Sequence, residues 1–385
     1  MLHEPRVGGA TTAVLRAVPD LEAAGWRFSF WAPCPSPIAG LLDRRGWPVA
    51  GEERPLRYSW GALRESPGPA RRLAATPGYL RRLRAHILGR RPDLVHVNTI
   101  VALPEAAVAR STRTPTLLHV HEMLTAGVRG AAAVRLARVA HHTAADSLAC
   151  ARPLRDLGLG TSVVTPGLAL PPPRPARRPG RPGDRPLVVG TLATVSERKG
   201  SDLFVAAAGA LKARRPDVEF RMVGWLASGR ERAWAQALTR RAQAAGVRWW
   251  PTEDPLGELA DWDVFVLPTR RDPFPLVVLD ALGSGLPVVA TRVDGLPEQV
   301  DSGSGVLVGA DDPDALVAAI GALLDDAPRR AALGAGGRAR LAADFTPERH
   351  ARELAAAYEA TLDAAGGSRR SGERRSAGRR LFCGA

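Results

Sequence analysis

Residues Leu187–Arg214 read LVVGTLATVSERKGSDLFVAAAGALKAR and combine a strand pattern, a polar loop and a helix pattern. The apolar run Leu187–Ala193 predicts a buried strand, and Asp202–Arg214 has the spacing of a helix. Lys199 and Gly200 stand at the end of the loop between them. A strand buried on both faces and followed by a helix is typical of parallel sheets in layered proteins. The stretch therefore predicts an α/β fold.

The same alternation continues on both sides of this stretch. After it, strands are predicted at Glu219–Gly224, Val247–Trp250, Val264–Pro268, Pro287–Thr291 and Gly305–Val308, with helices between them. Before it, strands are predicted at Arg27–Pro33, Leu94–Asn98, Pro115–His121 and Ser162–Thr165. The chain is thus predicted to form two Rossmann-like, doubly wound domains that face a central cleft, where ligands bind at the carboxyl ends of the strands.

The composition excludes several classes of protein. With 385 residues, 45% of them apolar and 24% charged, the chain fits a globular protein of two domains. No run approaches the ~18 apolar residues of a membrane span, and the N-terminus has no signal-peptide core. The three cysteines, Cys34, Cys150 and Cys383, are too far apart for a disulfide framework or a metal cluster. We therefore expect a cytoplasmic enzyme.

The formal net charge of +14 does not indicate nucleic-acid binding once its distribution is considered. Nearly all the positive charge is arginine, because lysine occurs only at Lys199 and Lys212. Much of the excess lies in two Pro- or Gly/Ser-rich segments, Pro171–Arg185 and Gly366–Arg380, whose composition predicts disorder. We expect no nucleic acid among the partners of this chain.

Lys199-Gly200 is a candidate anion site. Backbone amides at a helix N-terminus, with a lysine just ahead of them, suit a diphosphate. An exposed lysine in an ordinary strand-to-helix turn fits the local sequence equally well.

Two aspartates flank the apolar segment that follows the strand at 264–268. Asp272 is a candidate ligand contact, or only the N-cap of the next helix. Asp280 lies in a helix that is apolar nearly all round and is therefore predicted to be buried. A buried carboxylate needs partners, and two ribose hydroxyls would serve. The alternative is a salt bridge to Arg270 or Arg271; we favour the ribose.

Two features of the first half also suggest ligand contacts. Gly8 and Gly9 precede a helix and would let a substrate or phosphate approach the backbone, although a Gly-Gly pair usually marks only a turn. His119 and His121 share one face at the end of a strand. No third ligand at a metal-binding spacing accompanies them, so we expect no metal site. His121 is a candidate substrate contact, or else a hydrogen-bonded histidine under a loop.

Together these motifs resemble the family 4 glycosyltransferases, which have the GT-B fold. Gly8-Gly9, the strand ending at His121, Lys199-Gly200 and the acid-x7-acid segment occur in the order and spacing of that family. The resemblance continues through three later segments, Pro287–Thr291, Gly295–Glu298 and Gly303–Val308. It implies a retaining transfer from a nucleotide-diphosphate sugar, with no metal and no other cofactor. The acceptor would be a glycan, a lipid-linked sugar or a small molecule.

The resemblance also implies a role for each matching position. Lys199 would neutralise the donor diphosphate, and Asp280 would accept hydrogen bonds from the ribose hydroxyls. Asp272 would lie against the transferred sugar and phosphate, and His121 would contact the sugar from the opposite domain. We predict His121, Asp272 and Lys199 as catalytic residues. The predicted donor-binding set also includes Gly8, Gly9, Thr194, Arg198, Phe274, Pro275, Leu276 and Asp280.

Three departures from the family pattern stand out. The two acidic positions, usually glutamate, are aspartates, and Thr194 replaces a basic residue five before the lysine. Another arginine would then be needed at the diphosphate, and the candidates are Arg198, Arg270 and Arg271. The strand expected before Gly8 is absent. Either the start codon is placed too late, which is the interpretation we favour, or the sheet lacks a central strand.

The resemblance divides the chain into five parts. Residues 1–168 would form the acceptor-side domain, 169–186 a Pro/Arg-rich linker, and 187–345 the nucleotide-sugar-binding domain. Residues 346–365 would form a helix that returns to the first domain, and 366–385 a disordered basic tail. The main alternatives to a transferase are a catalytically degenerate subunit that binds a nucleotide-sugar or a partner, and a nucleotide-sugar epimerase or phosphorylase.

The segment 69–91 bears on the acceptor. Its arginines and apolar residues form a basic amphipathic helix, which can lie on the inner face of a membrane next to a lipid-linked acceptor. The alternative is an ordinary helix that packs its apolar face on the sheet.

Overall fold

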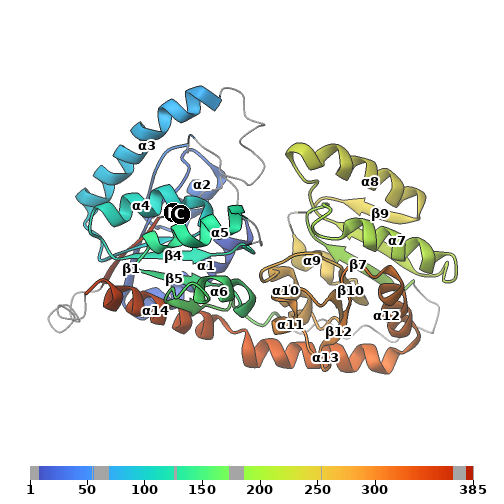
Figure 1. The fold of residues 1–385 in the computed structure, drawn as a ribbon. Coiled ribbons are helices and arrows are strands. Elements are labelled where there is room, and N and C mark those ends of the chain that lie inside the picture. The colour runs from blue at the N-terminus through green and yellow to red at the C-terminus, as the bar shows by residue number, and fades with distance from the viewer. Residues whose placement is uncertain are drawn as a thin grey trace. The chain divides into compact units, whose positions relative to one another are not determined.

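The computed structural model of the chain describes residues 8–53, 55, 69–124, 128–172, 186–252, 254–366 and 379–384 (Figure 1). The chain forms two units. Unit 1 comprises Met1–Gly167 and Pro347–Ala385, and unit 2 comprises Leu168–Thr346. The predicted linker, 169–186, lies mostly outside the described residues.

Unit 1 is built on a parallel sheet of seven strands. Their order is β2 (Val49–Ala50), β1 (Trp26–Trp31), β13 (Arg379–Gly384), β3 (Leu94–Val97), β4 (Thr116–Val120), β5 (His142–Ala145) and β6 (Thr161–Val163). The helices of this unit are α1 (Gly9–Ala23), α2 (Pro37–Arg44), α3 (Pro69–Arg90), α4 (Leu103–Ser111), α5 (Val128–Leu136), α6 (Leu148–Arg155) and α14 (Pro347–Ala364), with short 3-10 turns at Ile100–Ala102 and Ala137–Val139.

Helices α1 and α14 pack on one face of this sheet. Val18 of α1 and Leu354 and Tyr358 of α14 are buried there against Leu94 and Leu117 of the strands. Each such side chain contributes about 1.5–3 kcal/mol when fully buried. The polar residues that form the candidate site of unit 1 lie at the carboxyl ends of β3, β4 and β5.

Helix α3 packs on the other face. Its buried residues Tyr79, Leu83 and Ile87 lie four apart and join the core of that face, while Arg81 and Arg84 are exposed. This is the arrangement of an ordinary amphipathic helix, the alternative to membrane contact. No helix in the described part of the chain is long and apolar enough to cross a membrane.

One interior strand of the unit 1 sheet, β13, comes from the C-terminal residues 379–384. Strand β13 pairs in parallel with β1 on one side and with β3 on the other. Residues 379–384 therefore differ from the disordered tail predicted for 366–385, and the alternative that the sheet lacks a central strand is wrong. The apolar run Leu381-Phe382-Cys383 is short and follows a long Arg/Gly/Ser-rich segment, which hides its strand pattern. The misplaced start codon stays a prediction.

Unit 2 is built on a second parallel sheet, of six strands. Their order is β12 (Gly305–Val308), β11 (Val288–Thr291), β10 (Val264–Leu267), β7 (Val188–Leu192), β8 (Glu219–Val223) and β9 (Val247–Trp250). The helices are α7 (Ser201–Lys212), α8 (Arg232–Ala244), α9 (Pro255–Leu259), α10 (Leu276–Gly283), α11 (Leu296–Gln299), α12 (Pro313–Asp325) and α13 (Ala327–Asp344), with a 3-10 turn at Gly229–Glu231.

Both faces of this sheet are covered by helices. Phe204 of α7 and Ile320 of α12 are buried against Phe220 on one face, and Val278 of α10 is buried against Phe265 on the other. The two parallel sheets, each buried on both faces, confirm the predicted α/β class.

Candidate active site

The loop before α7 and the loop after β10 meet in unit 2 at an ion pair. The Lys199 ammonium donates to Oδ2 of Asp272, and the Nη1 atom of Arg198 lies 3.9 Å from the same oxygen. Asp272 is buried, with 5% of its side chain exposed, whereas half of the Arg198 side chain is exposed. Since β7 and β10 are neighbours in the sheet, their following loops converge at its carboxyl edge.

Gly200 fixes the path of the first loop. Its φ of +66° lies in the left-handed region, and a Cβ atom there would stand 1.8 Å from the carbonyl oxygen of Pro268. The second loop is also tied to the first, because the N–H of Arg270 and the hydroxyl of Thr269 both donate to the carbonyl of Arg198, at 2.8 and 2.9 Å. These contacts set the position of Lys199 beside Asp272.

The structure distinguishes two of the three arginines predicted to compensate for Thr194, Arg270 and Arg198, whereas Nε of Arg271 lies 3.8 Å from Oδ2 of Asp294. Arg270 donates to both oxygens of Asp202, at 2.8 and 2.9 Å, and to Asp311 at 2.6 Å. Hydrogen bonding to Asp202 is the largest of the effects that raise the pKa of its guanidinium. The guanidinium of Arg270 is therefore occupied by these two carboxylates. Arg198, next to Lys199, is the better candidate for a diphosphate, and Thr194 itself is exposed.

Asp272 does not cap the next helix. The N-cap of α10 is Pro275, with no side-chain cap. The Oδ2 atom of Asp294 instead accepts the backbone N–H of Asp272 at 2.9 Å. Asp294 has a φ of +46°, and burial, the largest cause, raises its pKa. The sequence interpretation missed this residue, although its place before Gly295 in the VDGLPE segment was a signal.

The remaining predicted residues of unit 2 surround α10. Phe274 is buried and packs edge-on against Phe345, at 5.8 Å between ring centroids. The carbonyl of Pro275 accepts from Nε2 of Gln299 at 3.1 Å, and Leu276 begins the helix. Asp280 is 6% exposed, so its predicted burial is confirmed.

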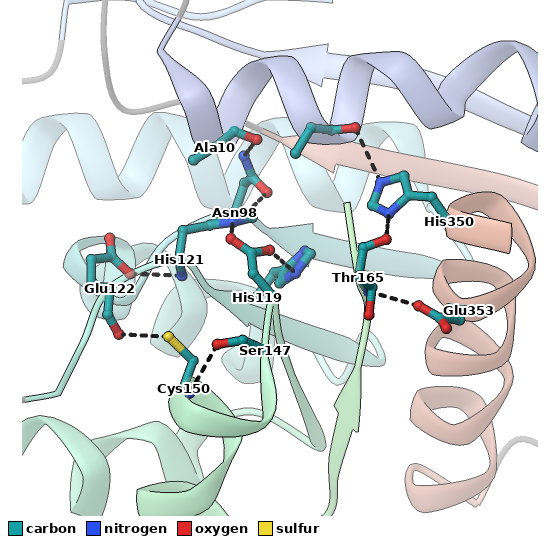
Figure 2. Close-up of polar contacts among 12 residues, drawn as sticks. Ala10, Asn98, His119, His121, Glu122, Ser147, Cys150, Thr165, His350 and Glu353 are labelled. Carbon is teal, nitrogen blue, oxygen red and sulfur yellow. Dashed lines mark hydrogen bonds and ion pairs between the residues drawn. The ribbon is translucent and has the colours of Figure 1, made fainter. Parts of the chain in front are cut away.

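In unit 1, Gly8 is the N-cap of α1, and Gly9 is its first residue. The carbonyl of Ala10, in the first turn, accepts from Nδ2 of Asn98 at 3.1 Å (Figure 2). The N-terminus of α1 is thus tied to the carboxyl end of β3, where Asn98 also reaches His121.

His121 lies at the centre of a buried polar cluster. Its Nε2 atom is 2.8 Å from Oδ1 of Asn98 (Figure 2). Its Nδ1 atom is 2.7 Å from Oδ2 of Asp146. The Nε2 atom of His119 lies 3.2 Å from the other oxygen of Asp146. The sequence interpretation missed Asn98 and Asp146, which directly follow β3 and β5; β5 itself, with the sequence HTAA, was not predicted as a strand.

The members of this cluster titrate differently. Burial alone would lower the pKa of His121, but the charge and hydrogen bond of Asp146, with a smaller effect of Glu122, raise it. Burial, followed by the charge of His121, lowers the pKa of His119 to about 4. Burial opposes ionisation of Asp146, yet His121 and His119 hold its pKa well below the usual range. These directions favour a charged His121 beside an ionised Asp146, with His119 neutral.

His119, His121 and Asp146 are also the described residues whose metal-ligating atoms lie within 4.8 Å of one another. The 2.7 Å between His121 Nδ1 and Asp146 Oδ2 is a hydrogen-bond distance. Two ligands of one tetrahedral zinc lie farther apart, at about 3.3 Å. These two atoms are therefore hydrogen-bonded to each other, and Asp146 is a third potential metal ligand beside the two histidines, which the sequence analysis did not identify.

Two family models match the chain, one in each half. The family described as "Glycosyl transferase 4-like domain" matches residues 8–151, and "Glycosyl transferases group 1" matches residues 184–326. The chain belongs to the family 4 glycosyltransferases. The resemblance expected from the motifs is thereby confirmed.

Other glycosyltransferases are similar to this family member over part of their length. The lipopolysaccharide core biosynthesis mannosyltransferase LpsB of Rhizobium meliloti is 39% identical over 45% of this chain and 52% of its own. A GDP-mannose-dependent phosphatidylinositol monomannoside mannosyltransferase of Mycolicibacterium smegmatis is 37% identical over 40% of this chain and 43% of its own. The chain thus spans about half the length of the curated relatives it matches.

Solved structures share the fold of this glycosyltransferase. Anabaena HepE, in complex with UDP and glucose, is 21% identical with a TM-score of 0.76, over 93% of this chain and 98% of its own. Sucrose-phosphate synthase from Thermosynechococcus elongatus is 22% identical with a TM-score of 0.71, over 94% and 97%. The chain therefore has the GT-B fold.

Proposed function

We propose that this glycosyltransferase is a retaining, metal-independent enzyme that moves a sugar from a nucleotide-diphosphate donor to an acceptor. The observation that carries the proposal is the pairing of Lys199 with Asp272 beside Arg198, at the N-terminus of α7. A buried carboxylate keeps the ammonium in place while no donor is bound. Fixed cations and helix-end amides can stabilise a departing diphosphate without a metal.

The donor would bind along the carboxyl edge of the unit 2 sheet. Lys199 and Arg198 would contact the diphosphate, and the buried Asp280 would accept hydrogen bonds from the ribose. The printed names of similar proteins include a GDP-mannose-dependent enzyme and a complex with UDP. The nucleotides tested for binding must therefore include both a guanine and a uracil nucleotide.

Calorimetry of the full chain with UDP, GDP and ADP tests the donor site. We expect one nucleotide to bind with EDTA present as tightly as without it. Loss of binding on chelation would contradict metal independence, and failure of all three nucleotides to bind would contradict the donor site. Binding without transfer to any acceptor would favour the degenerate subunit.

The acceptor would be a glycan, a lipid-linked sugar or a small molecule, and contact with a membrane surface would involve the exposed arginines of α3. Because Tyr79, Leu83 and Ile87 are buried in unit 1, α3 has few apolar side chains to insert. Co-sedimentation with anionic vesicles should accordingly be weak and should disappear in high salt. Binding that survives high salt would contradict this account, and no binding at low salt would remove the membrane contact.

A further inference from the structure

Both ring nitrogens of His121 have polar partners inside unit 1. Asn98 Oδ1 lies 2.8 Å from Nε2, and Asp146 Oδ2 lies 2.7 Å from Nδ1. The side chain of His121 is 4% exposed. The chemistry of these two partners determines where the ring carries its protons.

Asn98 can only accept from the ring. Its Nδ2 atom faces the carbonyl of Ala10 at 3.1 Å, and a carbonyl accepts hydrogen bonds but does not donate them. The amide nitrogen of Asn98 must therefore point to Ala10, and its oxygen must point to His121 (Figure 2). Because an amide oxygen has no proton to give, Nε2 of His121 carries one.

Asp146 accepts on the opposite side of the ring. A carboxylate has acceptor oxygens only, and the low pKa of Asp146 keeps it ionised at neutral pH. Nδ1 of His121 must then be protonated as well. The other Asp146 oxygen faces Nε2 of His119, whose lowered pKa leaves that ring neutral. A single imidazolium, that of His121, balances the carboxylate.

We propose that Asn98 and Asp146 are positioning residues that keep a proton on both ring nitrogens of His121, so that this histidine can donate a hydrogen bond to a substrate but cannot accept one. The consequence for binding rests on the proposed function, in which His121 contacts the substrate. The matching ligand atom is an acceptor oxygen, of a sugar hydroxyl or a phosphate, that replaces Asn98 Oδ1 at Nε2. While Asn98 Oδ1 occupies Nε2, that nitrogen carries a proton and cannot act as a general base.

The groups around His121 favour a single positive charge in the cluster, on the His121 ring. From its own strand end, Glu122 accepts the backbone N–H of His121 at 3.0 Å, and the ring of His119 lies 4.1 Å away between centroids. Across the neighbouring elements, burial lowers the pKa values of His96 on β3 and His350 on α14. Among the described residues, the titratable groups that interact with His121 are His96, His119, Glu122 and Asp146, and His350 interacts with His119 and Asp146.

Side-chain NMR of the full chain with 15N-labelled histidine tests the proposal directly. Near neutral pH, both ring nitrogens of His121 should show a bound proton, while those of His142, whose pKa burial lowers, should show one. Asp146→Asn should lower the pKa of His121 by about one to three pH units and leave most rings neutral at pH ~7.5. Asn98→Asp should have the opposite effect. A neutral His121 in the native protein, or an unchanged pKa in Asp146→Asn, would overturn the proposal.

Two controls complete the experiment. Asp156→Asn removes an exposed carboxylate at the end of α6, four residues from Arg152, and should leave the His121 signals unchanged. Adding EDTA should also leave them unchanged, and a shift on chelation would mean that a cation holds the cluster, which also overturns the proposal. The native spectrum decides the question even if a variant fails to fold.

Kinetics separate this inference from the proposed function. If the chain transfers a sugar, kcat/KM should fall as pH rises through the raised pKa of His121, and the fall should occur at lower pH in Asp146→Asn. An unshifted profile would overturn the role in substrate binding. If no nucleotide binds, the proposed function fails, while the NMR result still stands or falls independently.

Discussion

The two sheets of this molecule are assembled in different ways. All six strands of unit 2 come from one continuous segment, between Val188 and Val308. The described part of unit 1 forms a sheet of seven strands, and the third of them in spatial order, β13, comes from residues 379–384. Their polar sites differ likewise. Lys199 and Asp272 of unit 2 lie in recognisable motifs, whereas the partners of His121 come from β3 and the end of β5. The difference lies in the motifs and not in sequence separation, because Lys199 and Asp272 are 73 residues apart, whereas Asn98 and Asp146 lie within 25 residues of His121.

The largest expected effect comes from removing β13. A chain that ends at Gly366 lacks the strand between β1 and β3, and with it two parallel ladders of backbone hydrogen bonds. At about 1 kcal/mol per bond, the loss is of order 5–10 kcal/mol, comparable to the whole stability of a domain. Unit 1 should unfold while unit 2 stays folded.

Labelling of the buried Cys150 with a thiol reagent, located by mass spectrometry, reports on unit 1. It should become fast in the truncated chain, while nucleotide binding to unit 2 persists. A control chain should retain residues 379–384 and replace the arginines of the preceding segment with Gly and Ser. Slow labelling of Cys150 in the truncated chain would show that the sheet does not need β13.

The second difference between the units is their response to acid. All eight histidines of the chain lie outside 168–346, so unit 2 has none. In unit 1, burial lowers the pKa values of His96, His119 and His350, so the unfolded chain binds protons that the native state does not. The contribution of these three histidines to the free energy of unfolding of unit 1 is present above pH ~6.5 and is lost as pH falls toward 4.

His119 alone, with a pKa of about 4, accounts for about 3 kcal/mol. The raised pKa of His121 acts in the opposite direction: its contribution is complete below pH ~6.5 and is lost as pH rises through its folded pKa. Calorimetry should show the transition of unit 1 moving to lower temperature on both sides of neutrality, with that of unit 2 nearly constant between pH ~5 and 7. Equal shifts in the two units would contradict the assignment.

The third test measures how much Lys199 contributes to nucleotide binding by unit 2. Lys199→Ala removes a cation that would contact the diphosphate, and a charge-assisted hydrogen bond is worth about 1.5–3 kcal/mol. Nucleotide affinity should therefore fall about 10- to 100-fold, as measured by calorimetry.

The other lysine offers a matched control. Lys212 lies at the opposite end of α7 and donates to the carbonyls of Pro216 and Val218. Lys212→Ala removes the same charge and should leave nucleotide affinity unchanged. Equal losses in both variants would mean that net charge, and not the Lys199 site, binds the nucleotide.

The last test concerns Gly200. An alanine there must adopt a φ of +66° and would bring its Cβ against the carbonyl of Pro268. The left-handed conformation costs about 1–2 kcal/mol, and the displaced loop should also weaken nucleotide binding. Gly209→Ala is the control within the same helix, because its Cβ would meet only Ala245 at 3.7 Å. It should be neutral or stabilise unit 2 by about 0.4–1 kcal/mol in thermal unfolding. Similar losses in both variants would contradict the role of Gly200.

The sequence was most informative where a feature depended on neighbours along the chain. Asp280 was predicted to be buried because apolar residues surround it in one helix, and it is 6% exposed. Asn98 and Asp146 could not be assigned to His121, because their contact requires the strand order β3-β4-β5 and its register. Strand β13 was missed for a related reason. Its apolar run is short, and only its pairing with β1 and β3 makes it a strand.

The origin of β13 has a consequence for biosynthesis. Translation of unit 2 is complete at Thr346, but the sheet of unit 1 lacks its strand β13 until the ribosome has added residue 384. At about 5–20 residues per second, the delay is roughly 2–8 s. During this time β1 and β3 have no strand between them, and their unpaired backbone groups can pair with other chains. The second unit in the sequence is therefore the first that can fold, and the nascent first unit is the part that most needs chaperone protection.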